Sequence, residues 1–310
     1  MTGTVLILGA RGRFGHHAVE AFAAAGWRVR ALVRPGTPAP EGAEPAFADA
    51  TDAEALTEAA RGADVIVHAV NPPYPAWREQ LPRLTRAILA AARATGATVL
   101  FPGNVYVFAA DMPEVLTEDT PFGADTVKGR LRIEMEAAYR DSGVRTIVLR
   151  AGDFLDTRLG ENWFEAQVSK PVAKGAMVYP GPLDRMHAWA FLPDLARAAE
   201  GLAAKRADLD PYAVVHFEGL SVVGEDLARL MERAAGRELE RRSFPWTLIR
   251  LSSPFWPMGR ELLEMRYLWD VPHRLSGERL RAALSDLRET PAEEQIAAAL
   301  APRLRRTVPA

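Results

Sequence analysis

A glycine-rich turn near the N-terminus constrains the fold more than any other feature of this sequence. Gly9, Gly12 and Gly15 lie three residues apart, between an apolar run at residues 4–8 and an amphipathic stretch that Gly26 is placed to end. The first glycine allows a tight exit from a strand, the second lets the backbone approach a ligand, and the third lets helix and strand pack closely. Because helix N-termini offer free N–H groups to anions, the pattern predicts a strand, a phosphate-binding turn and a helix.

The first 150 residues alternate between short apolar runs and helical segments. Such runs are typical of strands that are buried on both faces of a parallel sheet. Strand alternating with helix indicates βαβ units, and hence an α/β fold with a Rossmann-type, doubly wound parallel sheet. The expected strands lie at residues 4–8, 28–33, 64–69, 98–101 and 145–149, and a loop is expected from Pro35 to Pro45.

The pattern loosens after about residue 150, where prolines and tryptophans become frequent. We expect residues 1–150 to form a dinucleotide-binding domain. Residues 151–310 are expected to form a smaller, mainly helical substrate lobe with returning sheet elements. Within that half, helices are expected at residues 192–203, 223–235 and 292–300, and a strand at residues 212–217.

Composition narrows the classes of function. The 310 residues carry a formal net charge of -2, which gives no reason to expect nucleic acid or an anionic membrane surface as a partner. The chain has no cysteine, so disulfides, thiolate zinc sites and cysteine nucleophiles are excluded. No secretion signal and no apolar run of membrane-spanning length is apparent. We therefore expect a cytoplasmic protein that binds a small molecule and no metal, and a homodimer is left open.

Two arginines bear on which dinucleotide would bind. An NAD site usually has an acidic residue at the end of the second strand, where it accepts hydrogen bonds from the ribose 2′-hydroxyl. This sequence has Arg34 there, and Arg11 within the turn could reach the same place. A guanidinium binds a phosphate through two N–H groups, whereas a carboxylate would repel it. The pair favours NADP(H), and the alternative is that both arginines are solvated surface charges.

The spacing of the three glycines, with Arg34 at the end of the second strand, resembles that of the short-chain dehydrogenase/reductase superfamily. The resemblance covers nearly the whole chain. It is strongest to extended and atypical branches, which include epimerase/dehydratase-like, NmrA-like and isoflavone-reductase-like proteins. It implies that Asp49 approaches the adenine, and that Ala69 lies against the cofactor where the strand that contains it ends.

The catalytic residues of extended members are only partly present. Such enzymes carry a serine, and a Tyr-x-x-x-Lys motif on the helix after the fifth strand. The tyrosine passes a proton, while the lysine lowers the tyrosine's pKa and holds the nicotinamide ribose. The resemblance puts Lys128 at the lysine position, but Ala124 stands at the tyrosine position and residues 101–106 contain no serine. Alanine cannot transfer a proton, so the usual chemistry cannot operate as written.

Isoflavone-reductase-type members keep a lysine on this helix without the tyrosine. By that resemblance Lys128 could orient the ribose and polarise a carbonyl or supply a proton. Asn104 could hydrogen-bond a substrate oxygen, and Tyr106 could be a substitute acid. The alternatives are that Lys128 is solvated, Tyr106 packs and Asn104 stabilises a turn. The expected cofactor-binding residues are Gly9, Arg11, Gly12, Phe14, Gly15, Arg34, Asp49, Ala69 and Lys128.

Loops that follow the expected strands carry aromatic side chains and few charges, which favours a small, partly apolar substrate. Tyr74, Trp163 and His187 are the expected substrate residues. The sequence thus predicts an NADP(H)-dependent oxidoreductase that moves hydride to a carbonyl or an enone. The missing tyrosine and serine keep a non-catalytic, NADP-sensing regulator similar to NmrA-like proteins as the alternative. A nucleotide-sugar epimerase or dehydratase ranks third.

Overall fold

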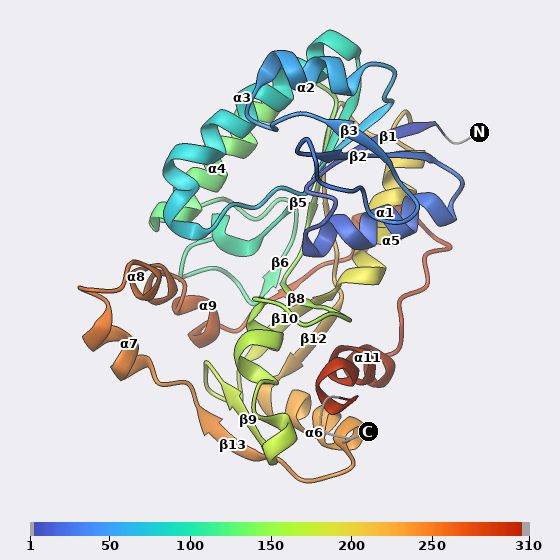
Figure 1. Ribbon diagram of the computed structural model, residues 1–310. Helices are drawn as coiled ribbons and strands as arrows, with labels where there is room; N and C mark the ends of the chain where they lie inside the picture. Colours follow the sequence, from blue (N-terminus) through green and yellow to red (C-terminus); the bar gives the residue numbers. More distant parts are fainter. Residues whose placement is uncertain (1–2, 306–310) are drawn as a thin grey trace.

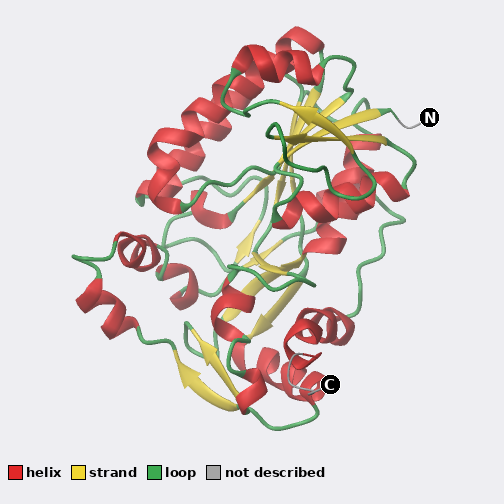
Figure 2. Cartoon of the chain, in the orientation of Figure 1, coloured by secondary structure: helices red, strands yellow, loops and turns green. Residues whose placement is uncertain are grey.

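A seven-stranded sheet lies at the centre of the larger half of the computed structural model, which describes residues 3–305 (Figures 1 and 2). Every pairing within it is parallel, and the strand order is β11-β7-β5-β4-β1-β2-β3. The chain changes direction across the sheet between β1 and β4, which is the switch point where Rossmann-type sheets bind ligands. The strands are β1 (Thr4–Leu8), β2 (Arg28–Val33), β3 (Glu44–Phe47), β4 (Val65–His68), β5 (Thr98–Gly103), β7 (Thr146–Arg150) and β11 (Tyr212–His216).

Helices cover both faces of this sheet, as Figure 1 shows. One face carries α1 (Arg13–Ala24) and α5 (Leu192–Ala204), which pack on each other and on the strands through buried alanine, leucine and phenylalanine side chains. The other face carries α2 (Ala53–Ala60), α3 (Trp77–Thr95) and α4 (Val127–Arg140). The sheet is therefore buried on both sides, and the predicted doubly wound α/β class is confirmed.

The smaller lobe combines helices with three short sheets (Figure 1). In one sheet β10 lies between β8, to which it is parallel, and β12, to which it is antiparallel; β13 pairs with β9, and β14 with β6. These strands are β6 (Val115–Leu116), β8 (Asp153–Leu155), β9 (Ala176–Tyr179), β10 (Met186–Phe191), β12 (Leu220–Val223), β13 (Glu240–Ser243) and β14 (Arg274–Leu275). Its helices are α6 (Gly224–Ala235), α7 (Trp246–Ser252), α8 (Pro257–Glu264), α9 (Tyr267–Asp270) and α11 (Ala292–Leu304). The helix α10 (Glu278–Ala283) instead packs on β11 in the core of the larger half.

The expected strand at residues 212–217 is β11, which lies beside β7 at one end of the central sheet. A strand that the sequence pattern did not predict, β3, forms the opposite end. Its sequence contains Pro45, which lacks a backbone N–H and fits an edge strand better than a central one. The expected loop from Pro35 to Pro45 therefore ends two residues earlier than predicted, since β3 starts at Glu44. Residues 306–310 of the expected second lobe lie outside the described residues. Among residues 3–305, no helix is long and apolar enough to cross a membrane.

Candidate functional site

The glycine turn between β1 and α1 leaves no room for side chains. Gly9 has a φ of +76°, and an added Cβ there would lie 2.8 Å from the backbone of Ala69 at the end of β4. An added Cβ on Gly15 would lie 2.1 Å from the Gly9 carbonyl oxygen, so only glycine lets α1 approach the turn. The Gly12 N–H donates to that same oxygen at 2.8 Å.

The start of α1 fits a phosphate group. Gly12 caps the helix without a side-chain hydrogen bond, and the first turn contains no acidic residue. The first backbone N–H groups of a helix have no partner within it and attract anions. Phe14 is buried in the core beneath the turn, and Ala69 lies partly exposed beside Gly9. These residues fit the pyrophosphate of a dinucleotide, with Phe14 supporting the turn from the core.

Positive charge gathers at the end of β2. Arg34 directly follows β2 and is exposed, while exposed Arg11 donates a hydrogen bond to the Pro38 carbonyl of the next loop at 3.4 Å. Within residues 3–305 neither guanidinium has a salt bridge to a carboxylate. Asp49 accepts hydrogen bonds from the N–H and hydroxyl of Thr51, both at 2.8 Å. Those bonds, with the Arg34 guanidinium as a smaller cause, hold the pKa of Asp49 below its usual value.

Lys128 lies at the start of α4, where Thr126 caps the helix by accepting a hydrogen bond from the Gly129 N–H. Its side chain is only 1 % exposed, so the solvated alternative does not hold in this structure. The Lys128 Nζ contacts two carboxylates of α8: Glu264, at 2.7 Å from Oε2, and Glu261. The Lys128 backbone N–H also donates to Glu264 Oε1 at 2.8 Å. Figure 1 shows α8 next to the start of α4.

A hydrogen-bonded pair of tyrosines lies near this lysine. Tyr74 and Tyr106 form a hydrogen bond of 2.7 Å between their hydroxyl oxygens, and the Lys128 Nζ lies 5.2 Å from the centre of the Tyr74 ring. Burial raises the pKa of both phenols, that of Tyr74 to about 12, and the hydrogen bond from Tyr106 opposes part of the rise at Tyr74. Asn104 Oδ1 accepts a hydrogen bond from the Tyr106 N–H at 3.1 Å, so the Asn104 side chain fixes the turn that carries Tyr106.

Arg132 lies one helical turn after Lys128 on α4. Its guanidinium lies 4.9 Å from the centre of the Trp77 ring, and its buried Nε has no hydrogen-bond partner. Burial lowers its pKa, but a guanidinium stays charged in proteins. Its charge also lowers the pKa of Tyr74 and of Tyr106 to a small extent. The charge of Arg132 therefore acts on both tyrosines, while the Lys128 ammonium lies near the Tyr74 ring.

The expected substrate residues fall in two places. Tyr74 lies at the lysine site, whereas His187 is 2 % exposed, stacks on Trp269 at 4.2 Å between ring centres, and contacts Asp153 Oδ2 through Nε2 at 2.8 Å. Trp163 packs on the other side chains of this aromatic cluster, 5.3 Å from Trp269 between ring centres. His187 thus contacts Asp153, whose own side chain is 21 % exposed, and Trp163 belongs to the same aromatic cluster as His187.

Sequence reasoning missed Glu261 and Glu264. They are three residues apart and so share one face of α8. No local motif marks them, because their partner Lys128 lies 136 residues before Glu264 in the chain. Asp153, the first residue of β8, is likewise not marked by any local motif. Within residues 3–305, no three His, Cys, Asp or Glu side chains gather in a way that could hold a metal ion.

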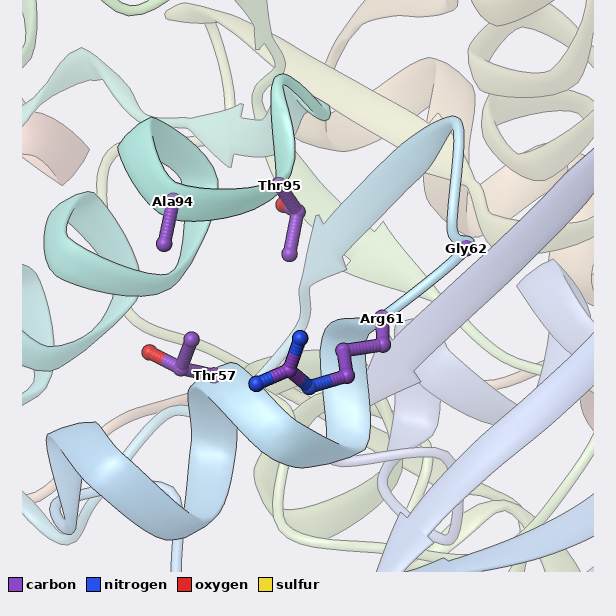
Figure 3. A pocket seen from close by; sticks show the side chains of 5 residues that line it. All are labelled: Thr57, Arg61, Gly62, Ala94 and Thr95. Atoms are coloured by element: carbon purple, nitrogen blue, oxygen red, sulfur yellow. The ribbon is translucent and has the colours of Figure 1, made fainter.

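A hollow of about 370 Å³ lies at the opposite edge of the sheet, at the ends of α2 and α3. Figure 3 shows Thr57, Arg61, Ala94 and Thr95 pointing toward one another across it, with Gly62 at its rim. These residues precede the amino ends of β4 and β5. Ligands of such sheets bind beyond the carboxyl ends of the strands, so this hollow is not the cofactor site.

Comparisons with known proteins identify the family. Residues 9–177 match the model of a family described as NAD(P)H-binding. The chain belongs to this NAD(P)H-binding family. A curated relative from Streptomyces sp, named 3-diazoavenalumate denitrifying reductase, is 36% identical over 168 residues, which cover 48% of this chain and 55% of the relative. The match thus spans about half of each protein.

Two solved structures illustrate the shared fold. A GalE-like L-threonine dehydrogenase from Cupriavidus necator superposes with a TM-score of 0.78 at 17% identity, over 97% of this chain and 99% of that one. A UDP-glucose 4-epimerase from Bifidobacterium longum, in complex with NAD+ and UDP, has a TM-score of 0.72 at 17% identity, over 96% and 97% of the two chains. The predicted likeness to epimerase-like members of the short-chain dehydrogenase/reductase superfamily is confirmed at the level of the fold.

Proposed function

We propose that this protein is an NADP(H)-dependent reductase that transfers hydride to a small, partly apolar substrate, such as a carbonyl compound or an enone. The observation that carries the proposal is the lysine site: Lys128 and two paired tyrosine hydroxyls lie together, on loops and a helix that follow the strands of a dinucleotide-binding sheet. The relative from Streptomyces sp is named as a reductase, which supports reductive chemistry for this chain as well.

The preference for NADP(H) rests on Arg11 and Arg34. Both guanidiniums are exposed at the end of β2, where the ribose 2′-substituent lies in folds of this type. Asp49, the carboxylate expected to approach the adenine, already accepts two hydrogen bonds from Thr51. A 2′-phosphate would gain charge-assisted hydrogen bonds there that a 2′-hydroxyl cannot form.

The lysine site can move a proton despite Ala124. When bound, the reduced cofactor supplies the hydride. We take Tyr74 as the proton donor of the pair, because the Tyr106 hydroxyl lies 2.7 Å from its hydroxyl and can donate a hydrogen bond to the phenolate that Tyr74 leaves. The Lys128 ammonium also lies 5.2 Å from the centre of the Tyr74 ring. We assign the protonation of the substrate oxygen to Tyr74, the support of Tyr74 to Tyr106, and the orientation of the ribose to Lys128.

The test is consumption of NADPH in the presence of aldehydes, ketones, enones and an aromatic diazo acid. Lys128→Ala should lower kcat by about 100-fold on any accepted substrate, since positioned acid–base groups contribute roughly 10²–10⁴-fold. Lys170→Ala, which changes an exposed lysine, is the matched control. Undiminished turnover by Lys128→Ala would remove the mechanism, and no turnover of any compound by the wild type would remove the proposed activity.

A regulatory NADP sensor is the second candidate. Two observations favour it: Ala124 stands at the position of the family tyrosine, and two carboxylates contact the Lys128 ammonium. A sensor should bind NADP(H) tightly, transfer no hydride, and bind a protein partner differently in the presence of oxidised and reduced cofactor. Reproducible turnover of one substrate would exclude it.

A further inference from the structure

The Lys128 ammonium has two carboxylate partners and one N–H to spare. Glu261 and Glu264 contact Nζ, and their side chains are 25 % and 20 % exposed, against 1 % for Lys128. An ammonium has three donors, so this arrangement leaves one for a ligand. A ligand that takes two hydrogen bonds from Nζ must therefore displace one carboxylate.

The two glutamates hold Lys128 unequally. Glu264 accepts one hydrogen bond from the Lys128 backbone N–H and a second from Nζ, whereas Glu261 contacts Nζ alone. The backbone N–H belongs to the first turn of α4, where the helix dipole also favours a negative charge. Glu264 is thus bound at two points and in a favourable field, so Glu261 is the partner that a ligand displaces more easily.

The same helix reaches the tyrosines. α8 packs against the short helix at Tyr74–Ala76, and the charge of Glu261 raises the pKa of Tyr74. The charge of Glu261 therefore acts on Tyr74 as well as on Lys128, and α8 lies close to both groups.

We infer that Glu264 and Glu261 are positioning residues of the active site: Glu264 fixes the Lys128 ammonium, and Glu261 is the partner that yields when the cofactor or substrate binds. The inference rests on the proposed role of Lys128. It places α8, a segment of the second half of the chain, in the machinery of the dinucleotide-binding half. It also explains why a lysine can be buried at the edge of the sheet, because an unpaired buried ammonium would be costly.

The lysines of this chain offer a direct measurement. The sequence has four, and Lys170, Lys174 and Lys205 are exposed while Lys128 is buried. Reductive methylation at a fixed pH, followed by peptide mass spectrometry, reports the rate at each amine. In the wild type Lys128 should react far more slowly than the other three, which act as internal standards. Equal rates at all four lysines would overturn the inference.

Substitutions separate the two glutamates. Glu264→Gln should raise the methylation rate of Lys128 about tenfold and lower kcat by about the same factor, as expected for losing a hydrogen bond to a charged group. Glu264→Asp, which keeps the charge, should restore part of both. Glu261→Gln should raise the methylation rate of Lys128 less than Glu264→Gln does, and it should change the Kd for NADPH more than it changes kcat. In the Glu261→Gln variant, saturating NADPH should make the methylation of Lys128 slow again.

Glu58→Gln is the matched control, because it neutralises a carboxylate in the exposed Glu58–Arg61 ion pair of α2. Circular dichroism and Tm establish whether each variant folds. If Glu264→Gln does not fold, Glu261→Gln still tests the inference. Unchanged Lys128 methylation in both variants would overturn the inference. A third outcome is that Lys128 methylation is slow in the wild type and faster in the variants, but that no substrate is turned over. That result would support the role of the glutamates in fixing Lys128 and would contradict the proposed reductase activity.

Discussion

The glycine turn after β1 and the lysine site at the start of α4 both lie on segments that follow strands of the same sheet, but they are built in opposite ways. The turn is made of backbone, and its glycines are needed because an added Cβ would lie 2.1 to 3.0 Å from a neighbouring backbone atom. The lysine site is made of side chains from α4, α8 and the loops after β4 and β5. We therefore expect substitutions in the turn to damage binding and folding together, and substitutions at the lysine site to affect chemistry more than folding.

The largest expected effect is at Gly15. In Gly15→Ala the new methyl would lie 2.1 Å from the Gly9 carbonyl oxygen, so α1 must move away from the turn. Overpacking of this kind costs about 1–3 kcal/mol, and the affinity for NADPH should fall by more than about 100-fold because the helix N-terminus moves with it. Isothermal titration and Tm measure the two effects.

Gly12→Ala sharpens this test. An added Cβ there lies 3.0 Å from the Gly9 oxygen, so the backbone has less to accommodate. Its Tm should fall less than that of Gly15→Ala, while NADPH affinity should still fall because Gly12 is one of the proposed phosphate-binding residues. Wild-type NADPH affinity in Gly15→Ala would contradict the role of the turn.

The same contrast explains what the sequence could reveal. The turn is encoded within seven residues, 9–15, and its flanking strand and helix were predicted correctly because periodicity is local. Lys128 could be found through the spacing of a family motif. Glu261 and Glu264 could not, since three-dimensional folding alone brings α8 to α4. β3 was missed for a related reason: Pro45 reads as a loop signal unless the edge position of the strand is known.

The next effect in size concerns the tyrosine pair. Tyr74→Phe removes the proposed proton donor and should lower kcat by about 100-fold, whereas Tyr106→Phe removes only its supporting hydrogen bond and should cost about tenfold. Both changes leave the ring packing in place, so KM for NADPH should change little. If Tyr106→Phe lowers kcat more than Tyr74→Phe, the two roles are exchanged.

A smaller effect is expected at the arginines beyond β2. Arg11→Ala and Arg34→Ala should each raise the Kd for NADPH by about tenfold, because each removes a hydrogen bond to a charged group. The Kd for NADH, which lacks the 2′-phosphate, should stay the same and is the internal control. Fluorescence titration with both cofactors measures the ratio, and equal losses for NADH and NADPH would contradict the phosphate assignment.

One contact joins the turn to the second half of the chain. The side chain of Arg13, the first residue of α1, lies against Gly160, and its Nη1 is 4.0 Å from Glu165 Oε2. Glu165 is fully buried. Its Oε1 accepts a hydrogen bond from the Asp156 N–H at 2.9 Å, but its Oε2 has no hydrogen-bond partner. Burial raises the pKa of Glu165 from 4.5 to about 7, so this link is sensitive to pH.

The smallest effect is therefore one of stability at Glu165. The folded state binds this proton more tightly than the unfolded state, so the free energy of unfolding should fall as pH rises from about 4.5 to about 7. Glu165→Gln removes the charge and keeps the hydrogen bond to Asp156. It should be more stable than the wild type at pH 8, by about 3 kcal/mol, and the difference should vanish near pH 4, below the unfolded-state pKa. Urea unfolding at both pH values, with Glu58→Gln as the surface control, measures it. A difference independent of pH would mean that Glu165 keeps its charge and that Arg13, despite its 4.0 Å distance, stabilises that charge in the folded protein.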